Sequence, residues 1–247
     1  MCSRYFLDAD GNVIAYTFRV PVHQGIRKRF NIAPTHEAPV IRAGAGGARE
    51  VALLRWGLVP SWAKELSIGS KLINARCETL TGKPAFRAAF RARRCIVPAS
   101  GFFEWTGEPR YRVPHAITVA GRPLVPFAGL WESWKAPDGR MLETYTIVTT
   151  GANAFVSGMH DRMPAILEED DIDAWLGGTV EEAQAVLKPY AEGAMREHMV
   201  SRALNSPNAE PEALPAPTAE ELARAAHGDE AAKAASKEPP RQSSLFD

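Results

Sequence analysis

Cysteines and long apolar runs are scarce in this chain, and both absences exclude classes of protein. The 247 residues include only three cysteines, Cys2, Cys77 and Cys95. So small and odd a number does not support a disulfide framework, which favours a reducing compartment. No apolar run approaches the roughly 18 residues that cross a bilayer, and the amino terminus lacks the apolar stretch of a signal peptide. We therefore expect a cytoplasmic protein without a membrane partner.

Net charge is also absent, but the balance hides an uneven distribution. The 29 Lys and Arg residues match 29 Asp and Glu residues, which taken alone argues against a nucleic-acid partner. Residues 206–247 carry 4 basic and 8 acidic side chains, together with 11 Ala, 6 Pro and a single aromatic residue, Phe246. Subtraction leaves residues 1–205 with 25 basic and 21 acidic residues, a net charge of +4. The part of the chain that can fold is therefore mildly basic.

The composition of residues 206–247 predicts a mostly disordered Ala/Pro/Glu-rich tail. Such a segment cannot bury enough apolar surface to offset the entropy lost on ordering. A short helix over 219–226 is expected within it, because Thr218 and Glu221 have the spacing of a capping box.

Residues 1–205 predict one compact α+β domain with a curved, mainly antiparallel central sheet flanked by short helices. Strands are expected at 49–56, 94–98, 125–131 and 143–149, where apolar and β-branched residues cluster between glycines and prolines. Helices are expected at 85–92, 170–175 and 179–190, the last from a Thr179–Glu182 capping box. We expect a monomer.

Motifs for metals, phosphates and dinucleotides are missing as well. There is no GxxxxGK[ST], GxGxxG or CxxC, and His160 has no HxxxH partner. We therefore expect neither a metal nor another cofactor.

Arginines and tryptophans are the first positive signal. On a helix over 85–92, Phe86 and Phe90 would face the core while Arg87, Arg91 and the following Arg94 line an adjacent stripe. This stripe is either an ordinary solvated face or a set of phosphate contacts. Arginine with exposed tryptophan suits single-stranded nucleic acid, whose bases stack on aromatic rings; the additional candidates are Arg55, Trp56, Trp62, Arg76 and Trp105.

Cys2 occupies the most unusual position. A small second residue permits removal of Met1, which would expose an amino-terminal cysteine. Its α-amine, with a pKa of about 7.7–8.0, and its thiol, with a pKa of about 8.5, would both be partly deprotonated near neutral pH. Such a 1,2-aminothiol condenses with an aldehyde to an imine, and the thiol then closes a five-membered thiazolidine on the same carbon. The alternative is that Cys2 is merely a small residue after the initiator.

A series of motifs then follows one another along the chain: Met1–Tyr5, Asn31–Thr35, Arg55–Trp62, Ile73–Thr79, Pro98–Trp105, Phe127–Trp131 and His160–Pro164. Together they resemble the SOS-response-associated peptidase (SRAP) family, the abasic site processing proteins. The resemblance covers about residues 1–205.

What the resemblance implies is a sensor of abasic sites in single-stranded DNA, active in the DNA damage (SOS) response and associated with the nucleoid. Such a protein captures the ring-opened deoxyribose aldehyde as a thiazolidine and so protects the lesion. By matched position, the catalytic residues would be Cys2, Asn74, Glu104 and His160. The DNA-binding residues would be Arg4, Asn31, Trp62, Arg76, Arg87, Arg91, Trp105 and Arg162.

The resemblance assigns a role to each catalytic residue. Cys2 would be the nucleophile, Asn74 would orient the α-amine and the sugar, and Glu104 would act as general acid and base. His160 would assist ring opening and imine formation. We expect Cys77 and Cys95 to be packing residues.

Two other functions stay open. The family name implies a hydrolase, and Cys2, His160 and Glu104 can be drawn as a thiol peptidase that removes its own Met1. Abasic-site chemistry through a Schiff base would instead be lyase-like. A non-covalent single-strand binding module is the third possibility, and it predicts salt-sensitive binding that is indifferent to Cys2.

The end of the tail suggests one protein partner. Gln242, Leu245 and Phe246 stand at the spacing of the QxxLF-type peptide with which bacterial replication proteins dock on the sliding clamp. An accidental Leu-Phe pair is the alternative.

Overall fold

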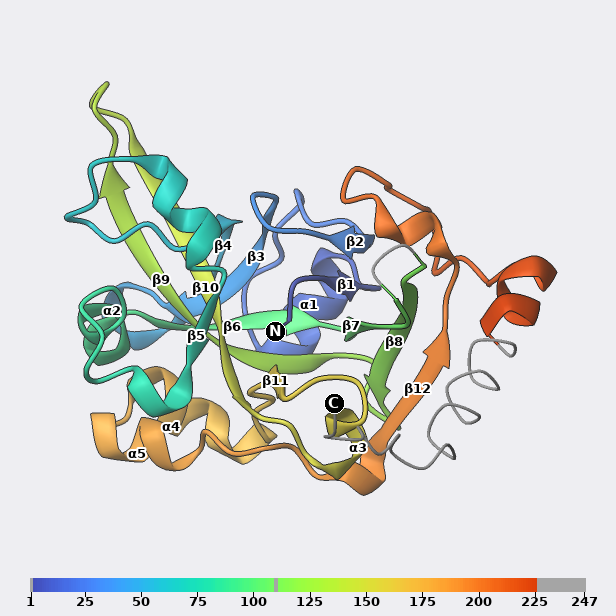
Figure 1. Ribbon diagram of the computed structural model, residues 1–247. Coiled ribbons are helices and arrows are strands. Elements are labelled where there is room, and N and C mark those ends of the chain that lie inside the picture. Colours follow the sequence, from blue (N-terminus) through green and yellow to red (C-terminus); the bar gives the residue numbers. More distant parts are fainter. Residues whose placement is uncertain (1, 109–110, 226–247) are drawn as a thin grey trace, which may run out of the picture.

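A computed structural model of the chain describes residues 2–108 and 111–225, and its strands form two sheets (Figure 1). The smaller sheet has the spatial order β12 (Met195–Met199), β8 (Val113–Val119), β7 (Gly101–Thr106), β1 (Tyr5–Leu7) and β2 (Arg29–Ile32). The larger has the order β11 (Arg162–Pro164), β10 (Met141–Gly151), β4 (Arg49–Trp56), β3 (Glu37–Ala43), β6 (Arg94–Ala99) and β9 (Val125–Lys135), with β5 (Asn74–Arg76) also paired to β10.

The larger sheet closes on itself. Strand β9 pairs with β6 on one side and with β10 on the other, so β10, β4, β3, β6 and β9 complete a small barrel. Among the described pairings, β10 runs parallel to β4 and β5, and the others are antiparallel. The predicted α+β class with a curved, mainly antiparallel sheet is confirmed, and the curvature takes the form of this closed barrel.

The helices are short and lie outside the barrel: α1 (Gly11–Phe18), α2 (Arg87–Ala92), α3 (Ala154–Ser157), α4 (Ile172–Gly177) and α5 (Val180–Ala185). Short segments of 3-10 helix lie in the connections: η1 (Ala45–Gly47), η2 (Leu66–Lys71), η3 (Cys77–Thr79), η4 (Glu169–Asp171), η5 (Glu192–Ala194) and η6 (Arg202–Asn205).

The predicted strands are present, but three helix boundaries differ. The capping box of Thr179 and Glu182 is confirmed, yet α5 ends at Ala185, four residues before Pro189, which has no N–H to donate to the Ala185 carbonyl group. Helix α2 starts at Arg87 rather than at residue 85, after a turn in which the Phe86 N–H bonds to Lys83 O. The helix expected at 170–175 is η4 followed by α4.

An aromatic cluster joins the two sheets just behind the start of the chain. Tyr5 of β1 and Tyr145 of β10 are fully buried, and their hydroxyl groups form a hydrogen bond of 2.8 Å. Trp56 packs edge-on against Tyr5, with ring centroids 5.3 Å apart. Cys2, three positions before Tyr5, is therefore attached to a rigid part of the core.

The first part of the Ala/Pro-rich segment, expected to be disordered from residue 206, lies against the domain as far as residue 225. The Ser201 N–H bonds to Pro215 O at 2.9 Å, and Leu214 packs on an apolar cluster that contains Phe6 and Phe103. The predicted helix is present over 219–225, with the capping box of Thr218 and Glu221. The proposed clamp-binding residues Gln242, Leu245 and Phe246 lie outside the described residues.

None of the helices in the described parts of the chain combines the length and the apolar character that crossing a bilayer requires.

Candidate active site

Cys2 is held in place from two directions. The Asn74 side chain, at the start of β5, donates a hydrogen bond from Nδ2 to the carbonyl oxygen of Cys2 at 2.7 Å. Strand β7 fixes the following residues, because the Phe103 N–H bonds to Arg4 O at 3.0 Å and Tyr5 pairs with Phe102. The Cys2 side chain is fully buried, with Sγ 3.7 Å from Arg4 O. Residue 2 is thus fixed at its carbonyl group and through its neighbours.

Glu104 lies on β7 and is 4% exposed. Burial raises the pKa of its carboxyl group from 4.5 to about 7. The same effect, together with the charge of Glu104, raises the pKa of the Cys2 thiol well above its ordinary value. Near neutral pH the carboxyl group can therefore both give and take a proton, whereas the thiol is protonated.

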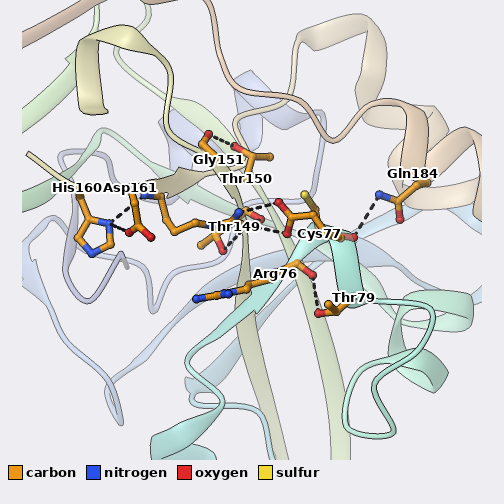
Figure 2. Close-up of polar contacts among 11 residues, drawn as sticks. Arg76, Cys77, Thr79, Thr149, Thr150, Gly151, His160, Asp161 and Gln184 are labelled. Carbon is orange, nitrogen blue, oxygen red and sulfur yellow. Dashed lines mark hydrogen bonds and ion pairs between the residues drawn. The ribbon is translucent and has the colours of Figure 1, made fainter. Parts of the chain in front are cut away.

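His160 lies two residues before β11, beside Asp161 (Figure 2). Its Nδ1 accepts a hydrogen bond from the Arg162 N–H at 2.9 Å and lies 2.7 Å from Asp161 Oδ1. Burial lowers the pKa of His160 below its ordinary 6.5, so the ring is mainly neutral near pH 7. The charge of Asp161 also acts on Glu104, which connects the His160 loop electrostatically to the carboxyl group beside Cys2.

Arg162 and Arg76 flank this site on β11 and β5. Arg162 is 9% exposed, forms an ion pair of 2.6 Å with Glu78 and donates to Thr149 O at 2.6 Å. Arg76 follows Asn74 by two residues on β5, and its side chain is exposed (Figure 2). Arg76 is therefore available to a phosphate group, whereas Arg162 is already bound to a carboxylate.

Arg4, Asn31 and Trp105 form a second polar group next to Cys2. The Arg4 Nη1 donates to Asn31 Oδ1 at 2.7 Å, and its guanidinium group lies over the Trp105 ring, 5.6 Å from the centroid. The indole N–H of Trp105 donates to Asn205 Oδ1 at 2.8 Å. Asn31 is 2% exposed, so it holds this group together from within.

The remaining predicted DNA contacts lie elsewhere. Trp62 is 59% exposed in the loop after β4, as a stacking residue requires. Arg87 and Arg91 are exposed on α2, but this helix lies to one side of the sheet, away from the start of the chain (Figure 1). The prediction that Arg94 extends their stripe is wrong: Arg94 belongs to β6, is 7% exposed and bonds to the carbonyl groups of Trp175 and Phe90.

Two partners of the site were missed from the sequence. Glu78 binds Arg162 from 84 residues away in the chain, and no local pattern connects the two. Asp161 was visible beside His160, but adjacency alone did not show that its carboxylate contacts Nδ1. Cys77 and Cys95 are buried, as predicted for packing residues.

Within residues 2–108 and 111–225, no group of three His, Cys, Asp or Glu side chains has the arrangement of a metal site.

The fold combines a small closed barrel with a site at the start of the chain, where Asn74 binds Cys2 near the buried Glu104. Residues 1–207 match the family described as SOS response associated peptidase (SRAP), and the chain belongs to it. It is similar to the abasic site processing protein YoqW of Bacillus subtilis, with 38% identity over 87% of this chain and 99% of that protein. It is also 31% identical to the abasic site processing protein HMCES of Xenopus tropicalis, over 76% of this chain and 65% of the relative.

Solved structures show the same fold. A crystal structure of a Bacteroides thetaiotaomicron protein superposes with a TM-score of 0.76 and 28% identity, covering 84% of this chain and 97% of that one. A Bordetella bronchiseptica protein gives a TM-score of 0.71 and 26% identity, over 81% of this chain and all of that one.

Proposed function

We propose that this protein processes abasic sites in single-stranded DNA by forming a covalent thiazolidine crosslink through Cys2 once Met1 has been removed. The observation that carries the proposal is the fixed position of Cys2, whose carbonyl oxygen is bound by Asn74 beside the buried Glu104 carboxyl. The names of the relatives YoqW and HMCES support abasic DNA as the substrate. Such a crosslink would shield the lesion during the response to DNA damage, in the cytoplasm at the nucleoid.

The reaction proceeds in two bond-forming steps. The α-amine of Cys2 attacks C1′ of the ring-opened deoxyribose, and the resulting carbinolamine loses water to give an imine. The thiol sulfur then adds to C1′, the C=N electron pair moves to nitrogen, and the thiol proton is transferred to that nitrogen. No oxidant or further reactant is consumed.

The side chains around Cys2 match the proton transfers that these steps need. With a pKa of about 7, Glu104 can protonate the departing hydroxyl group and later accept the thiol proton. Neutral His160 can take or give a proton at a ring nitrogen and suits a role in opening the sugar ring. The Asn74 Oδ1 atom is buried and makes no hydrogen bond within the described residues, so it can accept one from the Cys2 amine.

The peptidase alternative uses the same thiol differently. A thiol peptidase needs a thiolate, and burial raises the pKa of the Cys2 thiol. The aminothiol reaction instead begins at the amine and moves the thiol proton only after the imine has formed. The raised pKa of the thiol therefore supports aldehyde capture over a thiol peptidase, with Met1 removal as a preceding step.

The test is to incubate the purified protein with a single-stranded oligonucleotide that contains one abasic site. We expect an adduct that survives heating in detergent, is lost in Cys2→Ala and persists in Cys77→Ala, a matched substitution of another buried cysteine. An adduct retained by Cys2→Ala would refute the proposal. Peptide turnover without an adduct would favour the peptidase, and salt-sensitive binding without an adduct would favour a non-covalent module.

A further inference from the structure

The segment that begins in the last residues of η6 lies directly on the predicted DNA contacts. Asn31 Nδ2 donates to Ser206 O at 2.9 Å and to Ala209 O at 2.8 Å. Arg4 Nη1 donates to Leu204 O at 3.0 Å. In Figure 1 this segment runs beside β2. Residues 204–210, hereafter the strap, thus occupy the hydrogen-bond donors that were expected to bind DNA.

The strap also places a carboxylate between two arginines. Glu210 Oε1 lies 3.1 Å from Arg29 Nη2, and its Oε2 lies 3.9 Å from Arg27 Nη2. Both arginines, with His36 and Glu37, line a hollow of about 390 Å³ at the edge of β2. Arg29 and Asn31 are two residues apart on β2 and both contact the strap, so the hollow continues the surface that begins at Arg4.

The strap atoms that bind Arg4, Asn31 and Arg29 are oxygen acceptors, and their partners are guanidinium and amide N–H groups. The strap supplies carbonyl oxygens and one carboxylate. A nucleic acid backbone also presents oxygen acceptors, on phosphate groups whose negative charge attracts a guanidinium group and whose oxygens match its paired N–H donors. Arg4 forms no ion pair in the described parts of the chain, and its acceptors there are all neutral. A phosphate would therefore bind Arg4 more strongly than the strap does.

We propose that the surface formed by Arg4, Arg27, Arg29 and Asn31 binds the sugar-phosphate backbone of the DNA strand beyond the lesion, and that the strap occupies it until DNA displaces it. The proposal rests on the function proposed above. It assigns Arg27 and Arg29 to phosphate binding and makes Glu210 an intramolecular competitor of phosphate.

The test substitutes the competitor, Glu210, and one binding residue, Arg27, in the full-length protein. The measured quantity is the affinity of each variant for an unmodified single-stranded oligonucleotide. Glu210→Gln removes the competing carboxylate, and we expect binding up to about fivefold tighter, as suits a largely exposed ion pair. Arg27→Gln should weaken binding and reduce the slope of log affinity against log salt by about 0.7, the value for one phosphate on a single strand.

Each variant has a control with the same change of charge. Glu212→Gln alters the same segment two residues later, and Arg140→Gln removes an exposed arginine that pairs with Asp138. We expect both controls to stay close to the wild type. If Glu210→Gln matches Glu212→Gln and Arg27→Gln matches Arg140→Gln, the proposal is wrong.

Crosslinking to the abasic oligonucleotide, measured on the same preparations, separates this proposal from the one on which it rests. If the wild-type protein forms the adduct and all four variants bind the unmodified oligonucleotide equally well, the strap proposal alone is refuted. A wild-type protein that forms no adduct refutes the proposed function.

Discussion

Replacing Glu104 by glutamine should stabilise the folded protein at alkaline pH. Burial raises the pKa of Glu104 from 4.5 to about 7. Between these values the folded state binds more protons than the unfolded state, so the free energy of unfolding falls as pH rises. At about 1.4 kcal/mol per pH unit, the loss amounts to about 3 kcal/mol by pH 8. A neutral amide has no such term.

Urea unfolding of wild type and Glu104→Gln at pH 5 and pH 8 measures this difference. We expect the two proteins to agree within about 1 kcal/mol at pH 5, and the variant to be more stable by about 3 kcal/mol at pH 8. Crosslinking by the variant should be at least about 100-fold slower, the usual contribution of a general acid and base. A gain in stability together with a loss of activity would identify Glu104 as a functional rather than a structural residue.

Glu132→Gln is the matched control. Glu132 is also buried, at 5% exposed, but Arg93 lies 2.7 Å from its carboxylate. Its substitution should lower stability at both pH values, because it leaves the Arg93 guanidinium without a charged partner. If Glu104→Gln were no more stable than wild type at pH 8, ionising the buried Glu104 carboxyl would cost no stability, and its pKa would not be raised by burial.

Three further predictions concern the frame around the site. Asn74→Ala should slow crosslinking at least about tenfold in a single-turnover assay, because the loss of one hydrogen bond that positions a reacting group has an effect of this order. An unchanged rate would show that Asn74 takes no part in the mechanism. The hydrogen bond from Arg162 lowers the pKa of Glu78 to about 2, so its stabilisation is present above pH 4.5 and lost as pH falls towards 2. Because the Glu78 side chain is 53% exposed, Glu78→Gln should reduce stability at pH 6 by only about 1 kcal/mol or less, with no difference at pH 2. Tyr5→Phe should lower the free energy of unfolding by about 1–3 kcal/mol by leaving the Tyr145 hydroxyl unpaired, and adding Tyr145→Phe should recover most of that loss; further destabilisation by the double substitution would contradict this account.

Local patterns predicted the barrel strands β4, β6, β9 and β10 and two capping boxes. Residues 49–56 mix apolar and charged side chains as a strand can, and residues 143–149 are rich in β-branched side chains. The box of Thr179 and Glu182 needs only neighbouring residues, so these elements could be recognised in the sequence. Closure of the barrel depends on the pairing of β9 with both β6 and β10. That pairing joins distant segments, and no local pattern encodes it.

Helix α1 was not predicted. Asp10 caps it by accepting bonds from the N–H groups of Asn12 and Val13, but Val13 and Tyr16 are exposed. Apolar side chains on the outer face obscure the periodicity that normally marks an amphipathic helix.

The candidate site also combines residues that local motifs identify with partners that no local pattern identifies. The motifs contained Cys2, Asn74, Glu104 and His160, but their partners come from other segments. Glu78 stabilises Arg162 across 84 residues, and the acceptors of Asn31 belong to a segment whose composition predicted disorder.

The hydrogen bond from Asn74 to Cys2 has a consequence for maturation. It ends on the carbonyl oxygen of Cys2, an atom that takes no part in the peptide bond between Met1 and Cys2. Removal of Met1 converts the Cys2 nitrogen from an amide to an amine and leaves this anchor in place. The precursor can therefore assemble the framework of the site before processing, and a single cleavage then supplies the reactive amine without refolding.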